Sequence, residues 1–131
     1  MIGVKPIQEK SKQAEICAMF HIEYNVDTLM YGAYIEGKLV GCCQFGMPKG
    51  VGQIVDLAPT GERSASVEEA LFIMGRAALN FIDLCGVHEA YIAPPAETEE
   101  PLMRKIGFRP TEDGKWYMNL EGFFASPCSH H

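Results

Sequence analysis

The sequence predicts a single α/β domain over residues 1–131, built on a mixed, mostly antiparallel β-sheet. Three observations predict this fold class. Residues 29–58 contain three short apolar runs separated by tight polar loops, a pattern typical of an antiparallel meander. A long amphipathic helical pattern then covers 66–85, and another strand-like run follows at 87–92. Because a helix of this length provides a crossover, the last strand can pair in parallel with the strand before the helix.

Composition and charge narrow the functional classes. Hydrophobic residues make up 47% and charged residues 21% of the chain, which is ordinary for a globular domain with a substantial core. Seventeen acidic and eleven basic residues give a net charge of −6. The chain lacks a basic cluster, so we expect no nucleic-acid partner, and a cationic small molecule or a basic partner suits this charge better.

The cysteines and the apolar runs indicate a compartment. Five cysteines, an odd number, lie mostly inside apolar segments, which argues against a disulfide framework. No apolar run approaches membrane-spanning length, and residues 1–6 do not resemble a signal peptide. We therefore expect a cytoplasmic protein with reduced thiols and no membrane partner.

The amino-terminal part predicts four short elements before the central strand. In chain order these are a strand over 2–7, a helix over 8–21, and strands over 29–35 and 39–45. Asn25 and Asp27 are good turn formers between the helix and the second strand. Gly37 permits the positive φ that a tight hairpin loop needs. The third strand of the meander covers 52–58 and stops at Pro59.

The helix over 66–85 has the strongest pattern in the chain. Its apolar residues recur at three- and four-residue steps from Val67 to Cys85. Ser66 and Glu69 have the spacing of a capping box, and Gly86 stands where a left-handed C-cap is wanted. A strand that enters a helix through a polar turn is a common phosphate site, because the first helical N–H groups are unpaired.

The carboxyl-terminal part predicts a short strand, a short helix and a closing hairpin. These are a strand over 87–92, a loop at 93–96, a helix over 98–106 that ends at Gly107, and strand residues at Phe108 and 116–120. Residues 112–115 form the last hairpin turn.

This order of elements resembles the GCN5-related N-acetyltransferase (GNAT) family over nearly the whole chain. Residues 102–108, Leu-Met-Arg-Lys-Ile-Gly-Phe, are similar to the late helix-to-strand signature of the family, Leu-Tyr-x-Lys-x-Gly-Phe. Leu57-Ala58-Pro59 resembles the end of the family's central strand. The resemblance implies helices on both faces of the sheet. It also implies two splayed parallel strands, here 53–58 and 87–92, with the pantetheine arm of an acyl-CoA between them.

The same resemblance implies a cofactor loop. The family pattern Gln/Arg-x-x-Gly-x-Gly/Ala aligns with residues 63–68, where Arg63 matches, Ser66 replaces the first glycine and Glu68 replaces the last small residue. The residues implied to contact acetyl-CoA or another acyl-CoA are Leu57, Ala58, Arg63, Ser64, Ala65, Ser66 and Val67. Two like charges ~4 Å apart repel by about 4 kcal/mol at an effective dielectric near ~20, so Glu68 opposes a diphosphate. We therefore expect a degenerate cofactor loop, and plain helix capping explains the same residues.

Acyl transfer to an amine needs a base, donors for the oxyanion and a proton for the departing sulfur. By analogy Asp56 and Glu62 are the best-placed carboxylates, and burial of Asp56 in its apolar strand would raise its pKa. The alternative is a structural carboxylate bonded to loop N–H groups. The family tyrosine that protonates the thiolate aligns with Met103, which cannot donate a proton. Tyr91, on the strand expected to border the cleft, is the candidate substitute.

Three functions stay open. The first is an acyl-CoA-dependent N-acetyltransferase that acts on a small-molecule or peptide amine through an atypical cofactor site. The second is a GNAT-fold protein without acetyltransferase activity that serves as a ligand-binding or protein-interaction module, as Glu68 and Met103 suggest. The third is a metal-binding protein using Cys128, His130 and His131, because thiolate and imidazole are zinc ligands.

Two further features bear on metal binding and assembly. Cys17 and His21 have helical i,i+4 spacing and would add a second pair of metal ligands. Members of the family that the chain resembles commonly form homodimers. The aromatic pair Phe123-Phe124 either packs on the core or forms such an interface.

Overall fold

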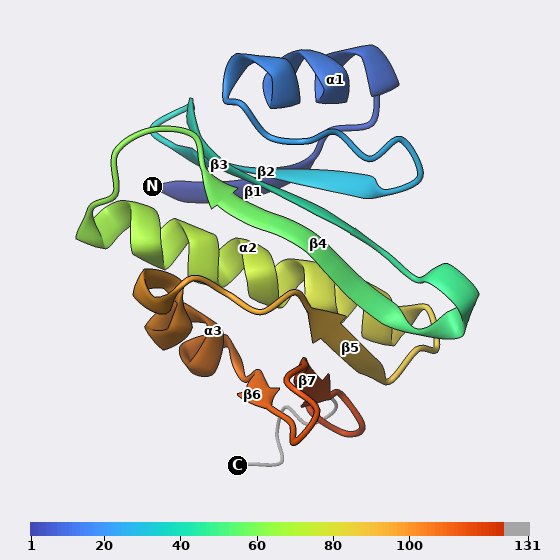
Figure 1. The fold of residues 1–131 in the computed structure, drawn as a ribbon. Coiled ribbons are helices and arrows are strands. Elements are labelled where there is room, and N and C mark those ends of the chain that lie inside the picture. The colour runs from blue at the N-terminus through green and yellow to red at the C-terminus, as the bar shows by residue number, and fades with distance from the viewer. Residues whose placement is uncertain (125–131) are drawn as a thin grey trace.

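The computed structural model describes residues 1–124, which form one seven-stranded sheet covered by helices (Figure 1). The strands are β1 Ile2–Pro6, β2 Leu29–Ile35, β3 Lys38–Gly46, β4 Gly52–Pro59, β5 Glu89–Ile92, β6 Arg109–Pro110 and β7 Trp116–Asn119. The helices are α1 Lys10–Met19, α2 Ala65–Leu84 and α3 Glu100–Ile106, with 3₁₀ turns η1 Pro48–Gly50 and η2 Glu97–Glu99. The strand order across the sheet is β1-β2-β3-β4-β5-β7-β6.

The sheet is mixed and mostly antiparallel, as the sequence predicted. Strands β4 and β5 pair in parallel, and the five other strand pairs within residues 1–124 are antiparallel. The parallel pair arises because the 20-residue helix α2 carries the chain back along the sheet between the two strands. Among these residues no helix is both long and apolar enough to cross a membrane.

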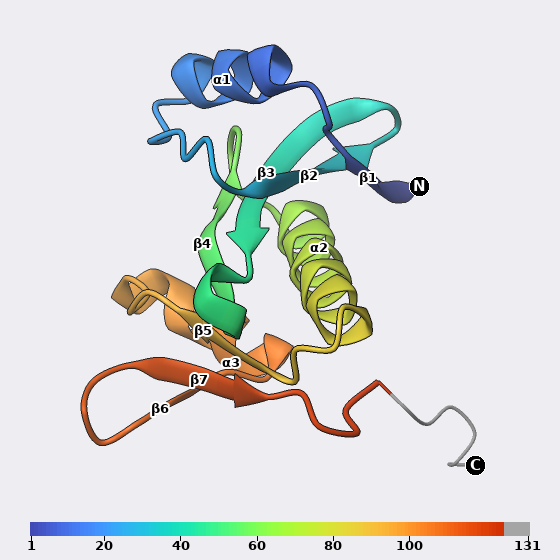
Figure 2. The same ribbon diagram turned by 90° about the vertical axis from the view of Figure 1, so that its right-hand side faces the viewer.

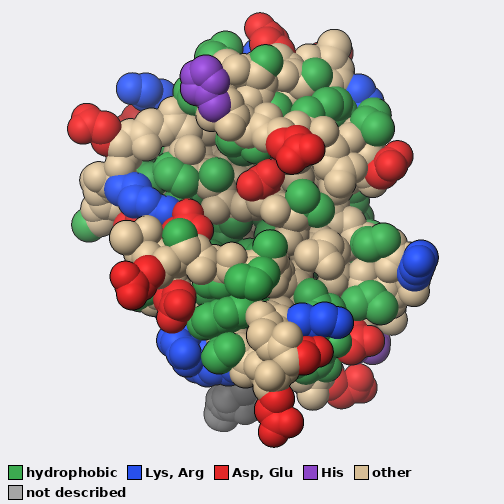
Figure 3. All heavy atoms as spheres, in the orientation of Figure 1, with side chains coloured by type: hydrophobic (Ala, Val, Ile, Leu, Met, Phe, Trp, Pro, Cys, Tyr) green, Lys and Arg blue, Asp and Glu red, His purple; other side chains and the backbone are tan. Residues whose placement is uncertain are grey.

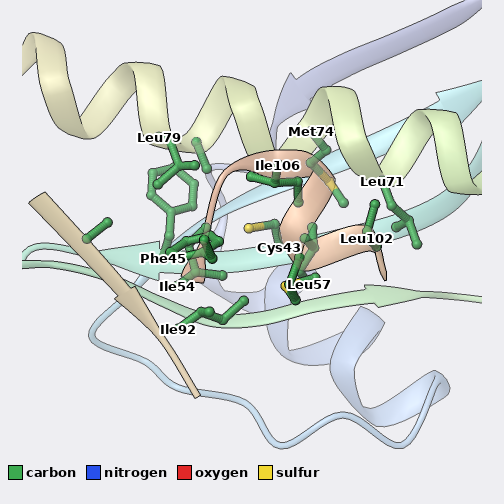
Figure 4. Packing of buried hydrophobic residues seen from close by; sticks show 14 of the residues in the cluster. Cys43, Phe45, Ile54, Leu57, Leu71, Met74, Leu79, Ile92, Leu102 and Ile106 are labelled. Carbon is green, nitrogen blue, oxygen red and sulfur yellow. The ribbon is translucent and has the colours of Figure 1, made fainter. Parts of the chain in front are cut away.

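Helices cover both faces of the sheet, which confirms the predicted architecture. Helix α1 lies over one face, and α2 and α3 lie over the other (Figures 1 and 2). The larger core fills the space between the sheet and α2 and α3, where Phe45, Ile54, Leu71 and Ile106 are buried (Figure 4). A smaller cluster lies beneath α1: Ile7, Ile16, Cys17, Met30 and Cys42.

The two covered faces explain why two neighbouring cysteines are both buried. Because strand residues alternate between faces, Cys42 and Cys43 point to opposite faces of the sheet. Cys42 packs in the cluster under α1 and Cys43 in the cluster under α2, so both are fully buried. Burial raises the pKa of both thiols, that of Cys42 to about 12, so neither is an activated nucleophile at neutral pH.

The predicted start of α2 was wrong and its predicted end was right. Ser64, in an extended conformation, is the N-cap, and its Oγ accepts the Val67 N–H at 3.2 Å. Glu69 does not reach back to a cap as a capping box requires, and its carboxylate contacts Lys105 of α3 at 3.5 Å. At the other end Gly86 has φ +89°, with N–H groups of Gly86 and Val87 bonded to carbonyls of the last turn.

Strand β4 contains the irregularity that opens the sheet. Gln44 pairs with Asp56 and Phe45 pairs with Ile54, so Val55 is an extra residue, a β-bulge. Beyond Ile54, β4 no longer pairs with β5. The two strands therefore separate at the point where the sequence comparison placed the cofactor arm.

Candidate active site

The gap between β4 and β5 contains a cavity of about 210 Å³. One wall is formed by residues 55–58 of β4, which include Leu57 and Ala58, and the other by residues 92–95, the last residue of β5 and the loop after it. Met103 of α3 and Glu99 of η2 complete the lining. We refer to this space as the donor cavity, because it occupies the position predicted for the pantetheine arm.

A larger cavity, about 660 Å³, lies beside the loop that joins α1 to β2. Residues 21–26 of the loop form one wall, and Val55 and Asp56 form the other. We call it the acceptor cavity. Val55 and Asp56 line both cavities, so the Asp56 residue borders the two spaces at once. A carboxylate residue at such a border is a candidate base for a reaction between molecules in the two cavities.

Asp56 is partly buried, and its surroundings raise its pKa above the ordinary value of an aspartate. Burial is the largest cause, because it disfavours the charged form. The nearby carboxylates of Glu23 and Glu99 act in the same direction. The Gln44 side chain opposes them by donating from Nε2 to Asp56 Oδ2 at 3.2 Å. The pKa shift has the direction that the apolar strand predicted. The hydrogen bond from Gln44 comes from a side-chain amide, whereas the structural alternative expected loop N–H groups.

The predicted cofactor loop joins β4 to α2, and its arginine is already engaged. Arg63 forms a close ion pair with Glu68 of α2 and donates from Nη2 to Glu99 Oε2 at 3.2 Å. Each of the three side chains is about one-third exposed. The guanidinium that aligns with the family's diphosphate contact therefore binds two carboxylates of this chain. Ser64, Ala65, Ser66 and Val67 form the start of α2 beside it.

The structure brings together some predicted residues and leaves others apart. Asp56 and Met103 line the donor cavity, whereas Glu62 is exposed and lines neither the donor nor the acceptor cavity. Tyr91 lines a separate cavity of about 280 Å³, and its ring packs 5.0 Å from that of Tyr117. This third space adjoins the donor cavity, because residues 92–94 line both.

Three polar residues around Asp56 were not predicted. Glu23 lies in the loop after α1, Glu99 lies in η2, and Gln44 is fully buried in β3. Gln44 did carry a signal, since it is a polar residue inside an otherwise apolar strand, and buried amides require hydrogen-bond partners. Acidic side chains are spread over the face that includes the ends of β4 and β5 (Figure 3).

The remaining expectations concern metal and the aromatic pair. Within residues 1–124, no three histidine, cysteine or acidic side chains gather as a metal site. Cys128, His130 and His131 lie outside the described residues. Phe123 and Phe124 pack edge to face, 4.9 Å apart, and the Arg76 guanidinium lies 4.8 Å from the Phe123 ring. Phe123 is still 42% exposed, so it packs on the domain only in part.

Comparison with known proteins identifies the fold. No family model and no curated protein matches the chain. An aminoglycoside acetyltransferase in complex with coenzyme A matches with a TM-score of 0.68 and 12% identity, covering 94% of this chain and 97% of that one. An N-acetyltransferase structure from Lactobacillus plantarum matches with a TM-score of 0.66 and 13% identity, covering 91% of this chain and 98% of that one. A GNAT-family acetyltransferase of Staphylococcus aureus matches with a TM-score of 0.64 and 11% identity, covering 92% of this chain and 99% of that one.

These matches define the class of protein by its fold. The chain has the acyl-CoA N-acyltransferase fold of the GNAT proteins, as its order of elements and residues 102–108 predicted. The separation of β4 and β5 is the feature that the resemblance to this family implied. The identities of 11–14% among the matched structures carry the fold and no more.

Proposed function

We propose that this protein is an acyl-CoA-dependent N-acetyltransferase that acts on a small amine. The observation that carries the proposal is the position of Asp56, which borders both the donor cavity and the acceptor cavity. A thioester in the first cavity and an amine in the second would meet at this carboxylate. Glu23 and Asp56 both line the acceptor cavity, and their negative charges favour an ammonium group there.

The residues around the donor cavity fit an acyl-CoA in most respects. Bound acyl-CoA supplies an activated thioester. Leu57 and Ala58 line the donor cavity, where the pantetheine arm is proposed to lie, and residues 63–67 are the segment that the resemblance implies for the diphosphate. Arg63 must exchange its carboxylate partners for the diphosphate. Exposed ion pairs contribute only about 0–1 kcal/mol each, so this exchange is feasible.

The chain's own groups suggest how protons move. Asp56 takes a proton from the acceptor amine, which must be neutral to attack a carbonyl carbon, and its raised pKa makes it a stronger base than an ordinary aspartate. Met103 lines the donor cavity and has no proton to give. The proton for a departing thiolate therefore comes from solvent or from Tyr91, whose cavity adjoins the donor cavity.

Calorimetry and product analysis test the proposal. We expect heat of binding when acetyl-CoA is titrated into the protein, and free thiol together with an acetylated amine when polyamines, aminoglycosides or amino-acid amides are added. The Asp56→Asn variant should bind acetyl-CoA as well as the wild type and transfer at least about 100-fold more slowly. No heat at millimolar acetyl-CoA would refute the proposal.

A second function is favoured by the engagement of Arg63. With Glu68 and Glu99 on its guanidinium, the protein could keep the GNAT fold and serve as a ligand-binding or protein-interaction module without acetyltransferase activity. The Glu68→Gly variant separates the two functions. If the wild type binds no CoA and the variant does, the fold has kept its donor cavity and only the loop has changed.

A further inference from the structure

The Gln44 side chain is fully buried at the centre of the candidate site, and all the hydrogen-bonding capacity of its amide is used. Its Oε1 accepts the Asn25 N–H at 2.9 Å and the Thr28 hydroxyl at 3.4 Å. Its Nε2 donates to the Glu23 carbonyl at 2.9 Å and to Asp56 Oδ2 at 3.2 Å. A buried amide with four partners is strongly constrained, because losing any one of them leaves a polar group unpaired.

The partners of Gln44 come from both walls of the acceptor cavity. Glu23 and Asn25 belong to the loop after α1, and Asp56 belongs to the bulged part of β4. Gln44 is the register partner of Asp56, so the two side chains lie on the same face of the sheet. The amide of Gln44 therefore connects the loop wall directly to the candidate base.

We propose that Gln44 is the positioning residue of this site, which fixes the Asp56 carboxylate and the loop of the acceptor cavity relative to each other. The inference rests on the proposed function for its catalytic consequence, since it concerns how Asp56 meets the amine. The contact itself is independent of that function. The bond from Gln44 favours the ionised form of Asp56, which is the form that accepts a proton.

Other titratable groups lie around Asp56 and must stay constant in a test. The carboxylates of Glu23 and Glu99 act on its charge, His21 lines the same cavity, and the buried thiols of Cys17, Cys42 and Cys43 lie near it. Gln44→Glu preserves shape and the acceptors for Asn25 and Thr28, removes the donors to the Glu23 carbonyl and to Asp56, and adds a negative charge beside Asp56. Gln44→Met removes all four bonds at similar volume. Thr28→Val removes the hydroxyl's bonds to the Asn25 carbonyl at 2.8 Å and to Gln44 at 3.4 Å and leaves the Asp56 contact in place, so it is the matched control.

The first readout is a titration of the Asp56 carboxyl carbon by NMR, assigned by its absence in Asp56→Asn. In Gln44→Met we expect the Asp56 midpoint at higher pH than in the wild type, because a bond to the charged form is lost. In Gln44→Glu we expect a larger rise, because the added carboxylate also repels the charged form. In Thr28→Val we expect no change. An unchanged midpoint in whichever Gln44 variant folds, or an equal shift in Thr28→Val, would overturn the inference.

The second readout is the pH profile of acyl transfer. We expect the acidic limb of kcat/KM to move to higher pH in the Gln44 variants and to stay in place in Thr28→Val, with kcat/KM about tenfold lower at neutral pH in the Gln44 variants. A limb that stays in place in the Gln44 variants would overturn the positioning role. If the wild type transfers no acyl group, the proposed function fails, and the NMR midpoints still decide the inference.

Discussion

Replacing Glu68 by glutamine tests whether this side chain opposes a diphosphate at the start of α2. Glu68 forms a close ion pair with Arg63, and Glu99 holds the other side of the same guanidinium. Glu68→Gln removes one negative charge from the loop and frees one face of Arg63, while the length of the side chain stays the same. We expect the variant to bind coenzyme A more tightly than the wild type.

The size of the effect follows from charge and exposure. Two like charges ~4 Å apart repel by about 4 kcal/mol at an effective dielectric near ~20 and by about 1 kcal/mol in water. The Glu68 side chain is 38% exposed, so solvent screens much of the repulsion and the lower end applies. A gain of about 1.4 kcal/mol corresponds to a tenfold lower Kd. The lost exposed ion pair should cost no more than about 1 kcal/mol of folding stability.

Isothermal titration at two salt concentrations measures the effect. Coenzyme A should bind the Glu68→Gln variant about tenfold more tightly at low ionic strength, and the gain should shrink at high salt because the charges are screened. Pantetheine, which has no phosphate, should bind the variant and the wild type equally.

Glu69→Gln is the matched control. It removes the same charge from the neighbouring position, where the carboxylate contacts Lys105 and not Arg63. A smaller gain is expected from it. The reasoning fails if Glu68→Gln leaves the Kd of coenzyme A unchanged, if Glu69→Gln improves it equally, or if pantetheine shows the same gain.

Three further predictions address the sheet, the base and the thiolate. Gly52→Ala should lower the free energy of unfolding by about 1–3 kcal/mol, because the added Cβ would lie 2.6 Å from the Glu89 carbonyl oxygen across the parallel pair. Urea titration measures this loss, and the control Gly3→Ala, with open space at its Cβ, should leave the free energy of unfolding nearly unchanged. Asp56→Asn should stabilise the fold increasingly as pH rises. Because the pKa of Asp56 is raised in the folded protein, its contribution to folding stability is fully present below its unfolded pKa near 3.8. That contribution is lost as the pH rises through the higher folded pKa. Thermal melts of the variant and the wild type across pH measure the difference. Met103→Tyr should raise kcat about tenfold by placing a phenol in the donor cavity, and an unchanged kcat in the folded variant would show that solvent already supplies the proton.

The order of elements could be predicted because it depends on local periodicity and turn chemistry. Alternating apolar residues mark the strands of the meander, and the three- and four-residue steps from Val67 onward mark α2. Gly86 ends that helix because the left-handed conformation at its C-cap costs glycine little. The start of α2 was harder to place, since both Ser64 and Ser66 can cap a helix. The path of the chain after β4 selects Ser64.

The candidate site depends on contacts between distant parts of the chain, so the sequence predicted only some of it. Asp56 stood out locally as a carboxylate in an apolar strand. Its partner Gln44 lies 12 positions away, and Glu99 lies 36 positions from Arg63. Such pairs form only when strands and loops pack together, and no short-range pattern specifies them.

The sequence by itself determined the order of elements and the class of fold. Periodicity, helix length and turn residues are sufficient for that order, because they act within a few residues of one another. The place where two parallel strands separate and the residues of a cofactor loop were implied by the resemblance to the GNAT family and not by these local patterns. Only the tertiary structure decided that Arg63 is engaged by Glu68 and Glu99, and that Asp56 borders two cavities and accepts a hydrogen bond from Gln44. Burial and the close approach of distant charges set these properties, and both exist only in the folded chain.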